Sequence, residues 1–110
     1  MSGLVGTSST KSKILGRPHD TAKAWARING NTPVLQESFN VKTYAEQSTG
    51  IHKIDFVNPM KTGNYCVVVS SASYWEFVGT TNAGDVTVEV RNNSNSATDT
   101  DKITILVFSE

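Results

Sequence analysis

Residues 21–69 have the sequence TAKAWARINGNTPVLQESFNVKTYAEQSTGIHKIDFVNPMKTGNYCVVV, and this stretch decides the fold class. Its first segment alternates small apolar side chains with large amphipathic ones, at Ala24, Ala26 and Ile28 against Lys23, Trp25 and Arg27. A period of two residues is typical of a β-strand, because successive side chains point to opposite faces of the sheet. Asn29-Gly30-Asn31 is a strong turn signal, which predicts the end of this first strand.

Three more strands are predicted in the same stretch. In the second, Leu35, Phe39 and Val41 are expected to share one face, although Glu37 interrupts it. A turn is predicted at residues 47–50, and a third strand follows it. In that third strand His52, Ile54 and Phe56 are expected on one face, and the charged residues Lys53 and Asp55 on the other.

The fourth strand is predicted at residues 65–69, a continuous apolar run that is typical of a strand buried on both faces. Cys66 is the only cysteine, which excludes an intrachain disulfide. A free cysteine in an apolar run usually packs as a small hydrophobe, so we expect Cys66 in the core.

The remaining chain adds three more strand signals. They lie at residues 74–78, at Val86, Val88 and Val90, and at residues 103–108, separated by loops at 80–85 and 92–101. The last strand has apolar residues on both faces, and one of these faces is expected to meet another subunit or to be covered by loops. Seven or eight short strands with regular turns and no helix predict an all-β fold. We expect a small antiparallel β-sandwich over residues 21–110, with a partly open barrel as the alternative.

Residues 1–20 are predicted to form an extended N-terminal arm rather than part of the core. The segment is rich in Gly, Ser and Thr, and it holds two short apolar islands, Leu4-Val5 and Ile14-Leu15. Residues 1–27 carry five basic side chains, at Lys11, Lys13, Arg17, Lys23 and Arg27, against Asp20 alone. Because the rest of the chain is net acidic, the arm is interpreted either as a tether that docks on a partner or as a solvated tail.

No catalytic, cofactor-binding or metal-binding motif is found, so no enzyme activity, cofactor or metal is expected. The two histidines, His19 and His52, are not spaced for metal binding with another His or Cys. We expect His19 to make a turn hydrogen bond and His52 to be a core or interface residue. Nucleic-acid binding is not expected because the chain has no net charge, and no segment is apolar over the length needed for membrane insertion.

Residues 74–77, Tyr-Trp-Glu-Phe, place three aromatic side chains near the loop at 80–85. The favoured interpretation is that Trp75 and Phe77 share one face and pack into the core, with Tyr74 at its rim. The alternative is a recognition patch, because aromatic residues dominate binding surfaces.

The same residues carry a family resemblance, in five pieces that follow one another in order. The pieces are Lys23-Ala24-Trp25 with Ile28-Asn29-Gly30, residues 37–41 (ESFNV), residues 50–56 (GIHKIDF), Met60 with Tyr65-Cys66-Val67-Val68, and residues 103–108 (ITILVF). From Thr21 to Phe108 the chain resembles the small all-β module at the C-terminal ends of bacteriophage tail-fibre and related virion proteins.

The resemblance implies a virion structural protein, assembled in the bacterial cytoplasm, in which three copies pack around a three-fold axis. Since only a short arm precedes the module, we expect a compact appendage rather than the tip of a long fibre. Leu4, Val5, Ile14 and Leu15 would anchor it to another tail or capsid protein. Tyr74, Trp75 and Asn82 would contact a host-surface glycan or protein. A capsid decoration protein without host binding and a carbohydrate-binding β module are the alternatives.

Overall fold

The structure is a computed structural model that describes residues 21–72 and 74–109, so the predicted arm at 1–20 lies outside the described residues. The described residues form eight strands: β1 (Ala22–Asn29), β2 (Val34–Phe39), β3 (Val41–Ser48), β4 (Ile51–Phe56), β5 (Cys66–Ser70), β6 (Trp75–Asn82), β7 (Asp85–Arg91) and β8 (Ile103–Phe108). In this part of the chain no helix is long and apolar enough to span a membrane.

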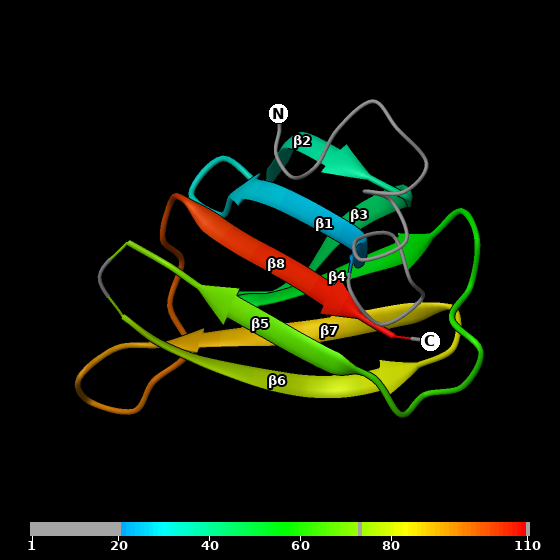
Figure 1. Cartoon of the computed structure of the whole chain (residues 1–110). Helices are drawn as coiled ribbons and strands as arrows, with labels where there is room; N and C mark the ends of the chain where they lie inside the picture. The colour runs from blue at the N-terminus through cyan, green and yellow to red at the C-terminus, as the bar shows by residue number, and fades with distance from the viewer. Residues whose placement is uncertain (1–20, 73, 110) are drawn as a thin grey trace, which may run out of the picture.

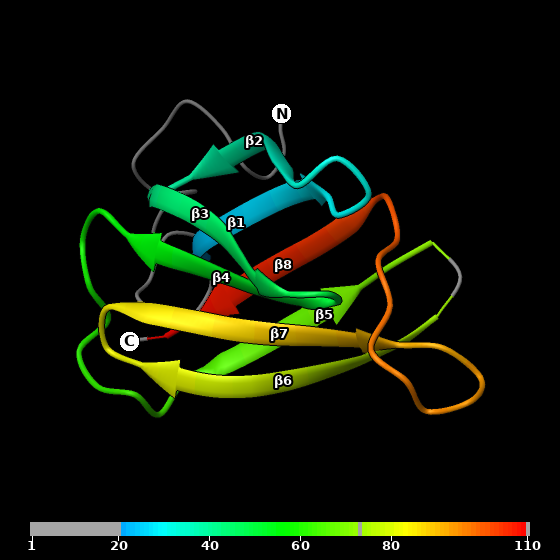
Figure 2. The same cartoon turned by 180° about the vertical axis from the view of Figure 1, so that it is seen from behind.

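Two four-stranded antiparallel sheets pack face to face (Figures 1 and 2). One has the order β2-β1-β8-β5, in front in Figure 1, and is called sheet A. The other has the order β3-β4-β7-β6, in front in Figure 2, and is called sheet B. The predicted antiparallel β-sandwich is therefore confirmed, with eight strands.

The core lies between the sheets and follows the predicted alternation. β1, β4, β7 and β8 each bury every second side chain, as the hydrophobic residues show: Ala24, Ala26, Ile28, Ile54, Phe56, Val86, Val88, Val90, Ile103, Ile105 and Val107. Burial of this apolar surface is the main favourable contribution to the stability of the sandwich.

The prediction that Leu35, Phe39 and Val41 share one face of a single strand is wrong. Val41 belongs to β3 in sheet B, and Leu35 and Phe39 point to opposite sides of β2. Leu35 lies opposite Ile28 and faces the core, whereas Glu37 lies opposite Arg27 and Phe39 opposite Trp25, on the outer side. The register between β1 and β2 shifts between Arg27 and Ile28, and such a β-bulge inserts one extra residue. The extra residue moves all later side chains of β2 to the other face.

The prediction that the fourth strand is buried on both faces, with Cys66 in the core, is also wrong. β5 is an edge strand of sheet A, and only Val67 and Val69 point inward. Cys66 is exposed on the outer side, together with Val68. An apolar run does not distinguish a buried strand from an edge strand whose outer face is apolar.

The predicted loop at residues 80–85 is shorter than expected. β6 continues to Asn82, and only Ala83 and Gly84 form the turn to β7. The register between β6 and β7 shifts between Val78 and Thr81, so a bulge takes up Gly79 and Thr80 without ending the strand.

Candidate functional site

The outer side of sheet A carries a continuous row of apolar side chains. Trp25 of β1 is the register partner of Phe39 in β2 and of Leu106 in β8. Leu106 in turn lies opposite Val68 of β5, and Phe108 lies opposite Cys66. We call these six residues the outer apolar face; they are Trp25, Phe39, Cys66, Val68, Leu106 and Phe108. The row crosses all four strands of the sheet.

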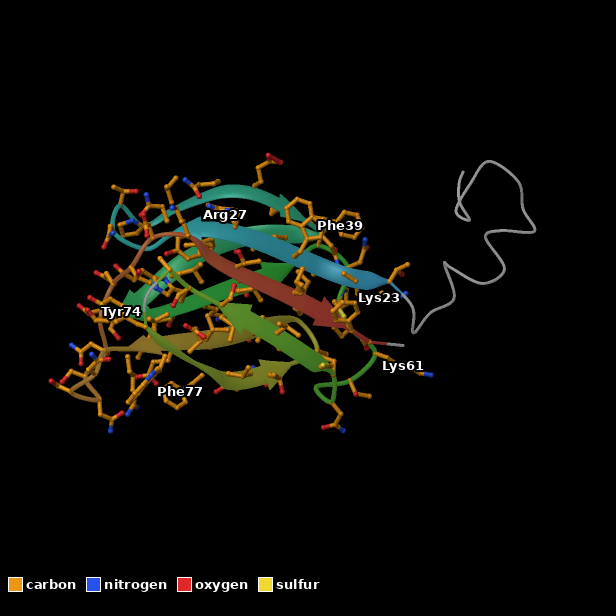
Figure 3. The ribbon with its side chains drawn as sticks, turned by 60° about the vertical axis from the view of Figure 1, so that its left-hand side comes forward. Lys23, Arg27, Phe39, Lys61, Tyr74 and Phe77 are labelled. Atoms are coloured by element: carbon orange, nitrogen blue, oxygen red, sulfur yellow. The ribbon has the colours of Figure 1, made fainter. Side chains whose placement is uncertain are left out.

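The outer apolar face is open to solvent in the single chain. Phe39 is 53% exposed and Val68 is 48% exposed, while Trp25 and Leu106 are half-buried by their neighbours. Figure 3 shows Phe39 on the outer side of the sandwich beside β1. Soluble monomers rarely expose a contiguous apolar patch of this kind unless it binds something.

A polar row borders the outer apolar face on the same side of the sheet. Glu37, Arg27, Thr104 and Ser70 are successive register partners across the same four strands. An apolar centre next to a polar border is the usual anatomy of a protein interface.

A hollow of about 590 Å³ lies at the end of this face, next to Phe39. Its walls come from the start of β1, the β2–β3 corner and the segment after β4, at residues 21–23, Phe39, Asn40 and 57–60. The first described residue, Thr21, lines it, so the described part of the chain begins beside the outer apolar face.

The predicted host-contact residues are not brought together. Trp75 and Asn82 lie at opposite ends of β6, opposite Arg91 and Asp85 respectively. Tyr74 packs against the core and is half-buried. The predicted anchoring residues Leu4, Val5, Ile14 and Leu15 all lie outside the described residues.

Trp75 and Phe77 share a face, but the expectation that this face packs into the core is wrong. Both project from the outer side of sheet B, 55% and 44% exposed, and Figure 3 shows Phe77 beyond β6. The guanidinium carbon of Arg91 lies 5.4 Å from the centre of the Phe77 ring, and Glu89 pairs with Arg91 at 2.9 Å. On the other side of this strand, Glu76 and Val78 lie opposite the core residues Val90 and Val88, and Glu76 is half-buried.

Three side chains of types that can bind a metal ion cluster at the end of the sandwich, near the turn that connects β3 and β4. Ligand-capable atoms of Glu46, His52 and Asp99 lie within 4.8 Å of one another. Glu46 and His52 are cross-strand partners in β3 and β4, and Asp99 comes from the loop between β7 and β8. His52 is fully buried, and its Nδ1 is 2.8 Å from the hydroxyl of Tyr44.

The surroundings of the cluster shift the pKa values of Glu46 and His52, and that of the neighbouring Tyr44. Burial lowers the pKa of His52, against the opposing effect of Asp99, so the imidazole is neutral. Hydrogen bonding with the Asp99 carboxyl group raises the pKa of Glu46, and burial adds to this. Burial, followed by the charges of Glu46 and Asp99, raises the pKa of Tyr44 to about 12, so the phenol is neutral.

Sequence reasoning did not find this cluster. The sequence does contain one signal, since the turn at residues 47–50 makes Glu46 and His52 cross-strand neighbours. Asp99, however, lies in a polar loop whose path the sequence pattern does not predict.

Comparison of the chain with protein-family models, with curated proteins and with solved structures found no match.

Proposed function

We propose that the protein is a bacteriophage virion structural protein, a short trimeric β module that the N-terminal arm anchors to the particle. The supporting observation is the outer apolar face, which crosses the full width of sheet A and is uncovered in the single chain. In the proposed trimer, each copy buries this face against its neighbours. The family resemblance of the sequence provides the virion setting and the three-fold arrangement.

The residue types of the outer apolar face support a subunit interface. Trp25 is central in the row, between Phe39 and Leu106, and Trp residues near the centre of an interface contribute most to binding. The exposed edge of β5 carries no charged side chain within residues 66–70, so it lacks the charges by which many soluble sheets block edge-to-edge contact. Burial of the outer apolar face in a subunit interface would cover both Trp25 and the uncharged strand β5.

The host-contact part of the proposal rests on a different surface. Trp75 and Phe77 on the outer side of sheet B remain exposed when sheet A is covered, so they are free to meet a host glycan or protein. The same two aromatic side chains support the alternative of a carbohydrate-binding module, because aromatic faces stack on sugars. Asn82, at the far end of β6, would contribute only to a second contact.

The solution mass of the full chain tests the oligomer, measured by light scattering over a range of concentrations. We expect three times the monomer mass of 11.9 kDa. Phe39→Ser should shift the mass towards the monomer, whereas the matched change Phe77→Ser on the opposite sheet should leave it unchanged. Circular dichroism of both variants establishes that they are folded. A wild-type monomer at all concentrations, or equal effects of the two variants, would contradict the trimer.

Particle incorporation tests the anchoring role and separates it from the oligomer. Deletion of residues 1–16 should leave the β-sandwich folded and its mass unchanged but abolish incorporation into phage particles. A truncated chain that still assembles into particles would overturn the tether. Copy number per particle then separates the two virion alternatives, since a decoration protein would be present in hundreds of copies without binding host cells.

A further inference from the structure

The cluster of Glu46, His52 and Asp99 leaves one buried nitrogen without a partner. Nε2 of the fully buried His52 has no hydrogen-bond partner among the described residues. A buried polar atom without a partner destabilises a fold by roughly 1–3 kcal/mol, so such atoms are rare in native proteins. Oε2 of Glu46 is also inaccessible to solvent, and the carboxyl group to which it belongs is hydrogen-bonded with that of Asp99. An unpartnered buried nitrogen beside two carboxyl groups points to a ligand at this position.

We propose that Glu46, His52 and Asp99 bind one divalent transition-metal ion of the Zn²⁺ type, with Nε2 of His52 and one oxygen of each carboxylate as ligands. This site does not depend on the proposed virion function. One imidazole nitrogen with two carboxylate oxygens is a donor set that suits Zn²⁺, whereas Ca²⁺ and Mg²⁺ prefer oxygen ligands alone. Three protein ligands leave a fourth position for water.

The environment of His52 matches that of a metal ligand. Its other ring nitrogen, Nδ1, is held at 2.8 Å by the hydroxyl of Tyr44. Histidine ligands are commonly oriented by a hydrogen bond at the nitrogen that does not touch the metal. In the tautomer whose Nδ1–H donates to the hydroxyl oxygen of Tyr44, the lone pair lies on Nε2 and is available to a metal.

The distances require a modest contraction of the site. Ligands at 2.0–2.1 Å from a tetrahedral Zn²⁺ ion lie about 3.3 Å from one another. One ligand-capable atom from each residue lies within 4.8 Å of the other two, so none of these pairs would have to approach by more than about 1.5 Å. Asp99 is the ligand best able to move, because it lies in the loop between β7 and β8 rather than in a strand.

A bound cation would also remove the electrostatic conflict at the site. Glu46 and Asp99 bring two carboxyl groups within 4.8 Å of each other, and two negative charges at such a distance repel. A divalent cation between them would offset this repulsion. Metal binding would thereby fasten the β7–β8 loop to the β3–β4 hairpin.

Calorimetric titration of the full chain, stripped of metal with a chelator, tests the site with Zn²⁺ as the probe. We expect one ion per chain, and we expect the Tm to rise by roughly 10 °C or more at a metal concentration 100 times Kd. Co²⁺ as a substitute should give the visible absorption bands of a tetrahedral site. Mg²⁺ and Ca²⁺ should not raise the Tm.

Two conservative variants identify the ligands. Glu46→Gln keeps the size of the side chain, and Asp99→Asn keeps the oxygen that accepts the hydrogen bond from Gly50, so both should fold. Each should weaken Zn²⁺ binding about tenfold or more, because even the loss of a group that only supports a ligand costs that much. The controls Asp101→Asn in the same loop and His19→Gln should bind Zn²⁺ as the wild type does.

Three outcomes would overturn the site. The first is the absence of Zn²⁺ binding up to about 1 mM. The second is unchanged affinity in both Glu46→Gln and Asp99→Asn. The third is a loss of binding in His19→Gln, which would place the ion elsewhere.

Discussion

Oδ1 of Asp99 accepts a hydrogen bond of 2.9 Å from the backbone N–H of Gly50, which lies 49 positions earlier in the chain. The carbonyl of Gly50 accepts a second one, at 2.8 Å, from the backbone N–H of Val90 in β7. Thr98 N–H in turn donates to the carbonyl of Val90 at 3.0 Å. The β3–β4 turn, the end of β7 and the loop before β8 therefore meet at one glycine.

Gly50→Ala is expected to destabilise the fold by about 3 kcal/mol, because two penalties combine. Gly50 has a φ of +74°, which is unfavourable for a residue with a Cβ atom. A Cβ there would lie 2.6 Å from the backbone nitrogen of Thr98 and 2.8 Å from the carbonyl oxygen of Val90. Urea unfolding measures the loss. Gly84→Ala, with no atom within 4 Å of the added Cβ, is the control and should change stability by less than about 0.5 kcal/mol.

Asn40 joins the two sheets at the corner between β2 and β3. Its side-chain amide donates to the carbonyls of Lys23 at 2.9 Å and Asn58 at 3.0 Å, and its Oδ1 accepts from the N–H of Asn58 at 2.8 Å. Its φ of 59° lies in the left-handed region, which Asn tolerates better than most residues. One residue thus sets both the backbone turn and the contacts between three segments.

Asn40→Ala is expected to cost about 3 kcal/mol, since it removes three hydrogen bonds and strains the backbone. Asn40→Gly relieves the strain but not the lost bonds, so it should be less destabilising than Asn40→Ala by about 1 kcal/mol. Thermal and urea unfolding of the two variants separate the contributions. If both variants were as stable as the wild type, the corner would be held by other contacts.

The sequence is sufficient to predict the strands whose faces differ in polarity. β4 and β7 have alternation without irregularity, and their buried faces are those expected. β2 and β6 were only partly predicted, because a bulge changes the face or length of a strand while leaving the local composition unchanged. Cys66 and Val68 show another reason why the sequence pattern was misread. Whether a strand lies at the edge of a sheet depends on pairings between segments that are distant in the sequence.

The candidate sites on the surface were also predictable only in part. Alternation separates Trp25 from the small side chains of β1, but β8 is apolar on both faces, so alternation alone does not place Leu106. The alignment of Trp25 and Leu106 with Phe39 and Val68 depends on the register of three strand pairs. The contact between His52 and Asp99 depends on the path of a loop without periodicity. Local patterns therefore predict which side chains leave the core, and the long-range pairing decides which of them meet.

Tyr65→Phe is expected to lower stability at neutral pH by about 1–2 kcal/mol. The hydroxyl oxygen of Tyr65 lies 2.7 Å from the carbonyl oxygens of both Asn82 and Asp85, which share its one proton, and so ties the start of β5 to the β6–β7 hairpin. The phenylalanine variant leaves both carbonyls without this donor. Urea unfolding at pH 7 measures the loss, and Tyr74→Phe is the control.

The raised pKa of Tyr65 also leads us to expect a loss of stability at alkaline pH. Burial raises its pKa to about 12, against an opposing effect of the Asn82 hydrogen bond and with a further rise from Asp85. Between the ordinary value of 10.0 and about 12 the unfolded chain loses the phenol proton and the folded chain keeps it. The free energy of unfolding should therefore fall as pH rises through this range. The slope should be smaller in Tyr65→Phe, and an unchanged slope would contradict the assignment.

The thiol of Cys66 should report whether the outer apolar face is covered in solution. Cys66 is exposed in the single chain and lies opposite Phe108, at the border of that face. If copies of the chain bury the face, the thiol should react slowly with a coloured disulfide reagent, and its rate should rise on dilution. Val68→Lys, which places a charge beside it on β5, should make the reaction fast at every concentration. Fast reaction of the wild-type chain at high concentration would show instead that this part of β5 stays open to solvent.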